Sequence, residues 1–222
     1  MNAHFYIGID PSGSDHRPSG LCVLTRKREI VRLQRWFSFN ELPVLLDEYA
    51  PDQCLVGVDG PLQPPHELHR CCFEDNSRCP HRQTTPYKGR SGEYQLIRMG
   101  FPCFPTSKNS FLRGWVRRCF ALSDWLVAQG FPVLEVFPFA TRRILFPTLS
   151  GKKQQRAFRE HLQCHLQEWG IRFPESEHLY SHDELDAVLA AVTVWLHDRG
   201  KTQLLGDERD GWIVIPQING LG

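Results

Sequence analysis

Short apolar runs closed by turn residues predict the strands of a central sheet. Phe5–Asp10 is one such run, and Pro11 and Gly13 close it. Residues 53–59 repeat the pattern, because this run also ends in an aspartate, Asp59, that precedes a Gly-Pro pair. Further runs of strand character span 20–25, 30–37, 132–137 and 212–215, and the last is expected in a hairpin or at a sheet edge.

Apolar residues at helical spacing predict four helices. In residues 152–169, Phe158, Leu162 and Leu166 share one face. Ser181 and Glu184 form the Ser-x-x-Glu pattern that caps the start of a helix. The four helices are expected at 40–49, from 106 or 107 to 129, at 152–169 and at 181–199.

The order of these elements predicts a mixed α/β sheet in a single domain, residues 1–222. Three strands of an antiparallel meander come first, and two strands separated by helices follow, so these run parallel with helices on both faces. Residues 60–107 show no periodicity and are rich in Pro, Cys, His and Arg, which indicates a Cys-rich insertion. If the first and fourth strands are neighbours, Asp10 and Asp59 lie side by side at their carboxyl ends, where such sheets bind ligands.

Composition narrows the class of protein. With 26 Lys and Arg against 25 Asp and Glu, and 41% hydrophobic residues, the chain of 222 residues is globular and is no polyanion-coating protein. Its longest apolar stretch, 187–196, is too short to span a bilayer, and the N-terminus lacks an export pattern. We therefore expect a cytoplasmic protein without membrane contact, and the sequence leaves oligomer formation open.

Aspartates are the candidate catalytic groups. Asp183 and Asp186 are three residues apart on a predicted helix and project to one side. With Asp10 and Asp59 they supply four carboxylates that could hold Mg²⁺ or Mn²⁺, and two such ions can drive phosphodiester hydrolysis. Each aspartate also has a purely structural interpretation: a strand terminus, a favourable charge at a helix start, or a solvated surface group.

Six short motifs, spread over nearly the whole chain, carry a resemblance. They resemble a family of unknown function (domain of unknown function 429) described as predicted nucleases with an RNase H-like fold, and the Asp-x-x-Asp helix is similar to that of RuvC-type Holliday-junction resolvases. The resemblance implies an RNase H-like sheet and metal-binding carboxylates at Asp10, Asp59, Asp183 and Asp186, with Asp59 where the resolvases carry glutamate. Glu135 lies in a motif, and either joins the catalytic site or makes a buried structural hydrogen bond. The motifs are GIDPS at 8–12, VDGPL at 58–62, EVFP at 135–138, KK at 152–153, HDELDA at 182–187 and GWIVIP at 211–216.

Positive charge gathers near the predicted helix 152–169. Lys152, Lys153, Arg156 and Arg159 form a candidate nucleic-acid contact, because such a basic face can hold phosphates without reading sequence. A solvated helix face is the alternative.

Cysteines divide into two groups. Cys22, Cys54, Cys119 and Cys164 fall in strand or helix patterns and are expected to be small buried side chains. The thiols of the insertion, with two imidazoles, could bind Zn²⁺ or an iron–sulfur cluster, or stay free and reduced. The residues of this second group are His69, Cys71, Cys72, Cys79, His81 and Cys103.

These features favour a divalent-metal-dependent nuclease of the two-metal type that acts on structured DNA or RNA. A non-catalytic nucleic-acid-binding module with a degenerate acidic site is one alternative. The other is a phosphotransferase of the actin-like or sugar-kinase type, although the chain lacks the length for a second core domain and a later glycine-rich nucleotide loop.

Overall fold

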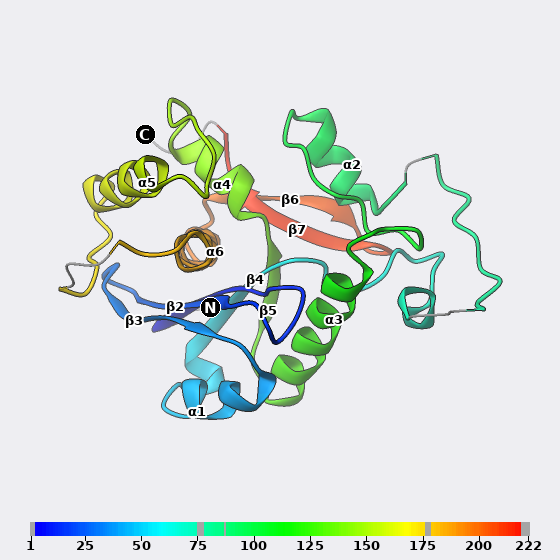
Figure 1. Cartoon of the computed structure of the whole chain (residues 1–222), viewed down its shortest axis with the longest axis horizontal. Coiled ribbons are helices and arrows are strands. Elements are labelled where there is room, and N and C mark those ends of the chain that lie inside the picture. The colour runs from blue at the N-terminus through cyan, green and yellow to red at the C-terminus, as the bar shows by residue number, and fades with distance from the viewer. Residues whose placement is uncertain (1–2, 75–77, 87, 176–178, 219–222) are drawn as a thin grey trace.

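One sheet of seven strands organises the chain (Figure 1). The computed structural model describes residues 3–74, 78–86, 88–175 and 179–218, so residues 75–77 and 87 of the predicted insertion lie outside the described residues. The strand order is β3-β2-β1-β4-β5-β7-β6. The strands are β1 (Phe5–Asp10), β2 (Ser19–Thr25), β3 (Ile30–Trp36), β4 (Cys54–Asp59), β5 (Val133–Val136), β6 (Thr202–Asp207) and β7 (Gly211–Pro216).

The pairing confirms the predicted RNase H-like arrangement. β1, β2 and β3 form an antiparallel meander, and β4 and β5 add parallel strands on the other side of β1. β7 joins β5 in parallel and pairs with β6 in an antiparallel hairpin. The sequence pattern did not predict β6, because Leu205 is its only buried residue and apolar alternation is therefore absent.

Helices cover both faces of the sheet, and two of them were not predicted. α2 buries Ser91, Gly92 and Glu93 beside a single leucine, so it has no apolar stripe, and α4 begins at Pro138 directly after β5. Within the described residues, no helix is long and apolar enough to cross a membrane. The helices are α1 (Leu42–Leu46), α2 (Ser91–Arg98), α3 (Arg113–Ala128), α4 (Pro138–Leu145), α5 (Arg156–Glu168) and α6 (His182–His197), with short 3₁₀ turns η1 (Phe39–Glu41), η2 (Pro51–Gln53) and η3 (Arg70–Phe73).

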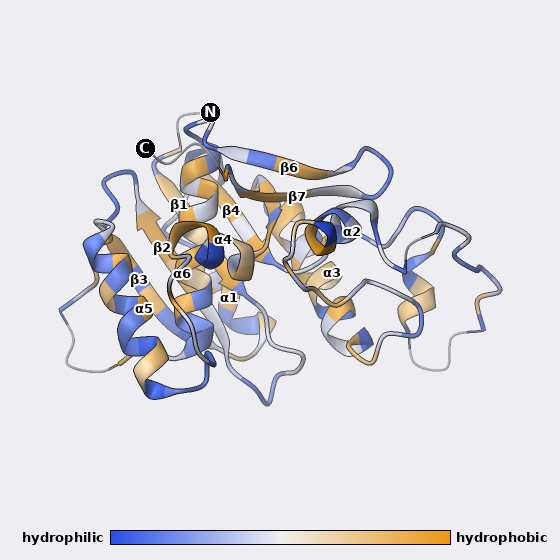
Figure 2. Ribbon diagram, turned by 90° about the horizontal axis from the view of Figure 1, so that it is seen from above, coloured by the Kyte–Doolittle hydropathy of each residue, from blue (hydrophilic) through white to orange (hydrophobic). Residues whose placement is uncertain are grey.

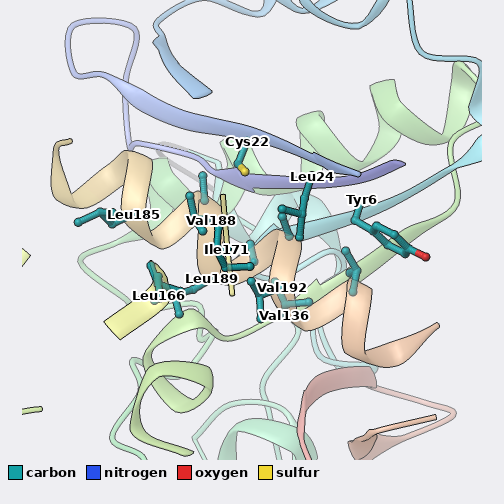
Figure 3. Packing of buried hydrophobic residues seen from close by; sticks show 14 of the residues in the cluster. Tyr6, Cys22, Leu24, Val136, Leu166, Ile171, Leu185, Val188, Leu189 and Val192 are labelled. Carbon is teal, nitrogen blue, oxygen red and sulfur yellow. The ribbon is translucent and has the colours of Figure 1, made fainter. Parts of the chain in front are cut away.

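Strand alternation decides which residues meet which helices. Ile7 and Ile9 of β1 pack with α1 and α3, whereas Tyr6 lies in the cluster with α5 and α6. Because side chains alternate along a strand, Gly8 and Asp10 share the face of Tyr6. α6 is packed directly on this face, and Figure 3 shows its apolar residues against those of β2.

Gly8 lets α6 approach the sheet closely. A Cβ atom at Gly8 would lie 2.0 Å from the carbonyl oxygen of Ala187 and 2.4 Å from the backbone nitrogen of Ala191. We expect Gly8→Ala to lower the free energy of unfolding by about 3 kcal/mol or more, the upper range of overpacking costs, because helix backbone must move. Urea denaturation measures the change.

Gly114→Ala is the matched control, because the nearest atom to its added Cβ, the carbonyl oxygen of Gly13, would be 3.9 Å away. We expect it to be neutral or to stabilise by up to about 1 kcal/mol, as alanine favours helices. Equal stability of the two variants would contradict the close contact between β1 and α6.

Candidate active site

Asp10 and Asp59 leave adjacent parallel strands at the same level. β1 and β4 pair with Ile9 opposite Val58, so the aspartates that follow lie side by side at the carboxyl ends. The alternation that places Asp10 on the α6 face does the same for Asp59, since Val58 belongs to the opposite cluster. Both carboxylates therefore face the start of α6.

α6 supplies the other two predicted carboxylates from its first turns. The capping box of Ser181 and Glu184 fixes this end of the helix, as predicted. Asp186 lines the same cavity as Asp10 and Asp59, and its Oδ2 accepts a hydrogen bond from Nζ of Lys153 at 2.7 Å.

Asp183 is not among the residues that line this cavity, although its charge contributes to the raised pKa of Asp10. Its Oδ1 is 2.8 Å from Nδ1 of His182, at an angle outside hydrogen-bond geometry, and its carbonyl oxygen packs where a Cβ of Gly20 would be. In the part of the chain that the structure describes, no three of the four carboxylates have oxygens within 4.8 Å of one another. The acidic site is therefore wider than a closed set of metal ligands.

Crowding of negative charge changes the protonation of the site. Burial raises the pKa of Asp10 well above its ordinary value, and the charges of Asp59 and Asp186 raise it further. Burial, then the charge of Asp186, raises the pKa of Asp59 to about 8. Burial lowers the pKa of Lys153, but the charges of the nearby carboxylates outweigh this effect and raise the pKa overall. Asp186 makes the largest of these contributions. The ammonium of Lys153 is thus the positive charge that the carboxylates share in this structure.

The cavity has a volume of about 600 Å³ and a mixed lining. Arg142 and Arg159 line it together with Lys153. The Arg142 guanidinium lies 5.0 Å from the ring centre of Phe139, which also lines the cavity, and 5.0 Å from that of Phe158. Acidic groups, cations and aromatic rings therefore surround one space large enough for a nucleotide-sized ligand.

Glu135 makes a buried ion pair with Arg90. Nη1 of Arg90 donates to Oε2 of Glu135 at 2.6 Å, a second bond joins Nη2 to Oε1, and the backbone N–H of Leu62 donates at 3.2 Å. Arg90 also donates from Nε to Oε1 of Glu93 at 3.1 Å. Burial raises the pKa of Glu135, and Arg90 opposes the shift. Glu135 thus makes the buried hydrogen bonds of one expected role, and it also lines the cavity that Asp10 and Asp59 line.

Arg90 and Glu93 were not predicted from the sequence as residues of this site. Glu93 is three residues after Arg90 and its Oε2 accepts a hydrogen bond from the Arg90 backbone N–H at 2.9 Å, as in a helix-capping box. The sequence therefore offered one sign of this helix start, an acidic residue three positions after the cap residue Arg90. The Ser or Thr that usually caps a helix is absent.

Glu135→Leu is expected to destabilise the protein by about 3–5 kcal/mol, because it leaves part of the buried Arg90 charge without a partner. Glu160→Leu is the control: Glu160 pairs with Arg156 on the exposed surface of α5, and losing such a pair costs under about 1 kcal/mol. Urea denaturation of both variants at pH 7 provides the comparison, and equal losses would show that the buried pair contributes no more than the surface pair.

The predicted basic face divides into inward and outward residues. α5 begins at Arg156 rather than at Lys152, so the expectation of one continuous basic helix face is wrong. Lys153, whose side chain is 49% exposed, and Arg159 line the cavity, and Nη1 of Arg159 donates to the carbonyl oxygen of Tyr180 at 3.1 Å. Lys152 and Arg156 are exposed, and hydrophilic and hydrophobic residues alternate along α5 (Figure 2).

The thiols of the insertion are brought together in part. Ligand atoms of His69, Cys71 and Cys79 lie within 4.8 Å of one another, the only such His, Cys, Asp and Glu group in the described ranges. Cys103 lies apart from them: its Sγ donates to the carbonyl oxygen of Glu93 at 3.5 Å, and burial raises its pKa to about 12.

Three of the four remaining cysteines are buried as predicted, namely Cys22, Cys54 and Cys119. The prediction for Cys164 is wrong, because its side chain is exposed. Cys164 is two residues from both Leu162 and Leu166 of the buried stripe of α5, and that spacing turns it to the opposite side of the helix.

Residues 8–210 match the model of a family described as "Protein of unknown function (DUF429)". The chain belongs to this family. Among solved structures, the DUF429 chain is similar to Thermus thermophilus RuvC and to T. thermophilus RuvC in complex with Holliday junction substrate. Both are 14% identical over 87% of this chain. The alignment with the RuvC structure covers 95% of the RuvC chain with a TM-score of 0.41. The alignment with the Holliday junction complex covers 94% of the RuvC chain with a TM-score of 0.40. No curated protein matches the sequence.

Proposed function

We propose that the chain is a divalent-metal-dependent nuclease that hydrolyses phosphodiesters of structured DNA or RNA. The observation that carries the proposal is the convergence of Asp10, Asp59 and Asp186, from two parallel strands and a helix, on a cavity that also holds cations. Asp10 and Asp59 are crowded at the carboxyl ends of central strands and have raised pKa values, so a positive charge between them would stabilise their ionised forms. Mg²⁺ and Mn²⁺ prefer oxygen ligands of this kind.

The oxygen donors of these side chains fit such an ion in their chemistry, and the carboxylates would have to move closer together to bind it. Asp10, Asp59 and Asp186 would hold it, and Asp183 would join them by turning away from His182. The ion would supply an activated water and stabilise the charge on the phosphate. Lys153, which is bonded to Asp186 here, would with Arg142 and Arg159 supply positive charge for the phosphate oxygens of the substrate. The aromatic rings of the cavity give a base a surface to stack on.

A second function has one observation in its favour. The ion pair of Lys153 with Asp186 already neutralises part of the acidic site, and the carboxylates are not closed into a compact ligand set. A non-catalytic nucleic-acid-binding module would have these features. It differs from the nuclease in that binding would be independent of divalent metal and hydrolysis would be absent.

A cleavage screen separates the two functions. The protein, stripped of metal and then given Mn²⁺, is incubated with junction DNA, an RNA–DNA hybrid, structured RNA and a small phosphodiester. The nuclease proposal expects cleavage of at least one substrate and its loss in EDTA. Binding of nucleic acid with equal affinity in EDTA and in Mn²⁺, without cleavage of any substrate, would favour the binding module.

A further inference from the structure

Two thiols and an imidazole of the insertion converge on one point, away from the acidic cavity. The sulfurs of Cys71 and Cys79 and a ring nitrogen of His69 lie within 4.8 Å of one another. Cys72 directly follows Cys71, and its side chain is fully buried in the apolar cluster with Phe73 and Phe120. Two sulfurs and one imidazole nitrogen therefore surround a single position, and Cys72 is the adjacent candidate for the fourth ligand of a Cys₃His site.

A cation lies beside this position. Lys108 is held there because its Nζ donates to the carbonyl oxygen of Cys79. A nearby positive charge favours thiolates, which are the form in which cysteines bind metal.

The segment around the thiols has little regular secondary structure. Residues 61–74 extend away from the sheet beyond α3 in Figure 1, and their only regular element is η3. Phe73 anchors η3 edge-on against Phe120 of α3, with ring centres 5.4 Å apart, and Cys72 is fully buried beside it. Residues 78–86 contain no helix or strand. A metal that joins η3 to Cys79 would add to the small apolar cluster that holds this segment against α3.

We propose that His69, Cys71 and Cys79 bind a structural zinc ion, and that Cys72 completes the tetrahedral site by turning its side chain toward them. Zinc bonds of about 2.3 Å to sulfur place tetrahedral sulfur ligands about 3.8 Å apart, so the three ligand atoms within 4.8 Å need only a small closure. An iron–sulfur cluster usually takes four thiolates, and the fourth candidate, Cys103, is bonded elsewhere.

The zinc site would also support the wall of the acidic cavity. Lys108 connects the thiol cluster to the segment that carries Phe104 and Thr106, both of which line that cavity. Loss of zinc would therefore loosen the cavity wall without removing any of its carboxylates.

Elemental analysis of the full chain, purified after expression in zinc-supplemented medium, tests the proposal. We expect one zinc per native chain, less than about a tenth of that in Cys79→Ser, and full zinc in Cys164→Ser, whose exposed thiol contacts Glu168 instead. Asp10→Asn should also keep its zinc, so the result is independent of whether the chain is a nuclease.

A second measurement does not depend on the folding of a variant. Native protein in which Co²⁺ replaces the metal should show tetrahedral d–d bands and intense thiolate charge-transfer absorption. Native protein that contains no stoichiometric zinc and shows no such absorption would overturn the proposal. Stoichiometric iron with labile sulfide would do the same and assign a cluster instead.

Discussion

Replacing Asp10 by asparagine is expected to lower metal-dependent cleavage by about 10³-fold while the fold stays intact. The amide has nearly the same volume as the carboxylate but lacks the negative charge that holds a cation, and losing one such electrostatic group costs about 10²–10³ in rate. Burial and neighbouring carboxylates make an ionised Asp10 unfavourable. The variant should therefore be at least as stable as the native protein in thermal denaturation without metal.

Asp52→Asn is the matched control for this prediction. Asp52 is exposed in η2, at the end of β4 opposite to Asp59, and it does not line the cavity. Its substitution should therefore leave cleavage unchanged. Initial cleavage rates at saturating Mn²⁺, measured beside circular dichroism, separate a catalytic loss from unfolding. Native rates in Asp10→Asn would remove Asp10 from the active site, and equal losses in both variants would point to a general effect of lowered negative charge.

Metal affinity is expected to fall about tenfold for each pH unit below about pH 8. The pKa of Asp59 is raised to about 8, so its carboxyl group is protonated at neutral pH and must lose its proton before it can bind a cation. Asp10 and Asp59 interact, so they titrate as a pair rather than as independent groups. Binding of Mn²⁺ at pH 7 should therefore release protons.

The same shift predicts how stability changes with pH in the metal-free protein. The folded pKa of Asp59 lies above its unfolded value of about 4, so the native state binds more protons between pH 4 and 8, and this group's contribution to stability falls as pH rises through that window. Mn²⁺ should restore the loss near pH 8, because it takes over the role of the protons.

Calorimetry in two buffers of different ionisation enthalpy counts the protons released. Asp59→Asn should release fewer protons than the native protein, whereas Asp52→Asn should release the same number. An affinity that stays constant from pH 6 to pH 8 would contradict the assignment of Asp59 as a protonated metal ligand.

The placement of the acidic residues was predictable because strand alternation is a local rule. Two apolar runs that each end in aspartate, Phe5–Asp10 and Cys54–Asp59, had to place those aspartates together once the strands were neighbours. The start of α6 was likewise fixed by the side chains of Ser181 and Glu184. These features depend on contacts within a few residues or on the period of a strand.

The remaining features depend on contacts between distant segments. Arg90 meets Glu135 across 45 positions, and Lys153 meets Asp186 across 33, so no periodic pattern contains either pair. α2 is held by buried polar groups rather than by an apolar stripe, which removes the usual pattern of a helix. Cys103 belongs to the same insertion as the other thiols, yet it packs against a different apolar cluster, which contains Leu96 of α2.

The proposed nuclease hydrolyses phosphodiesters with the carboxylates of this cavity and a divalent cation. The most direct test follows cleavage of the best substrate while Mn²⁺ is titrated into metal-stripped native protein and into Asp10→Asn. We expect a saturable rise in rate for the native protein, a response near background for the variant, and no rate in EDTA. Equal cleavage in EDTA and in Mn²⁺, or equal rates for the two proteins, would contradict this proposal.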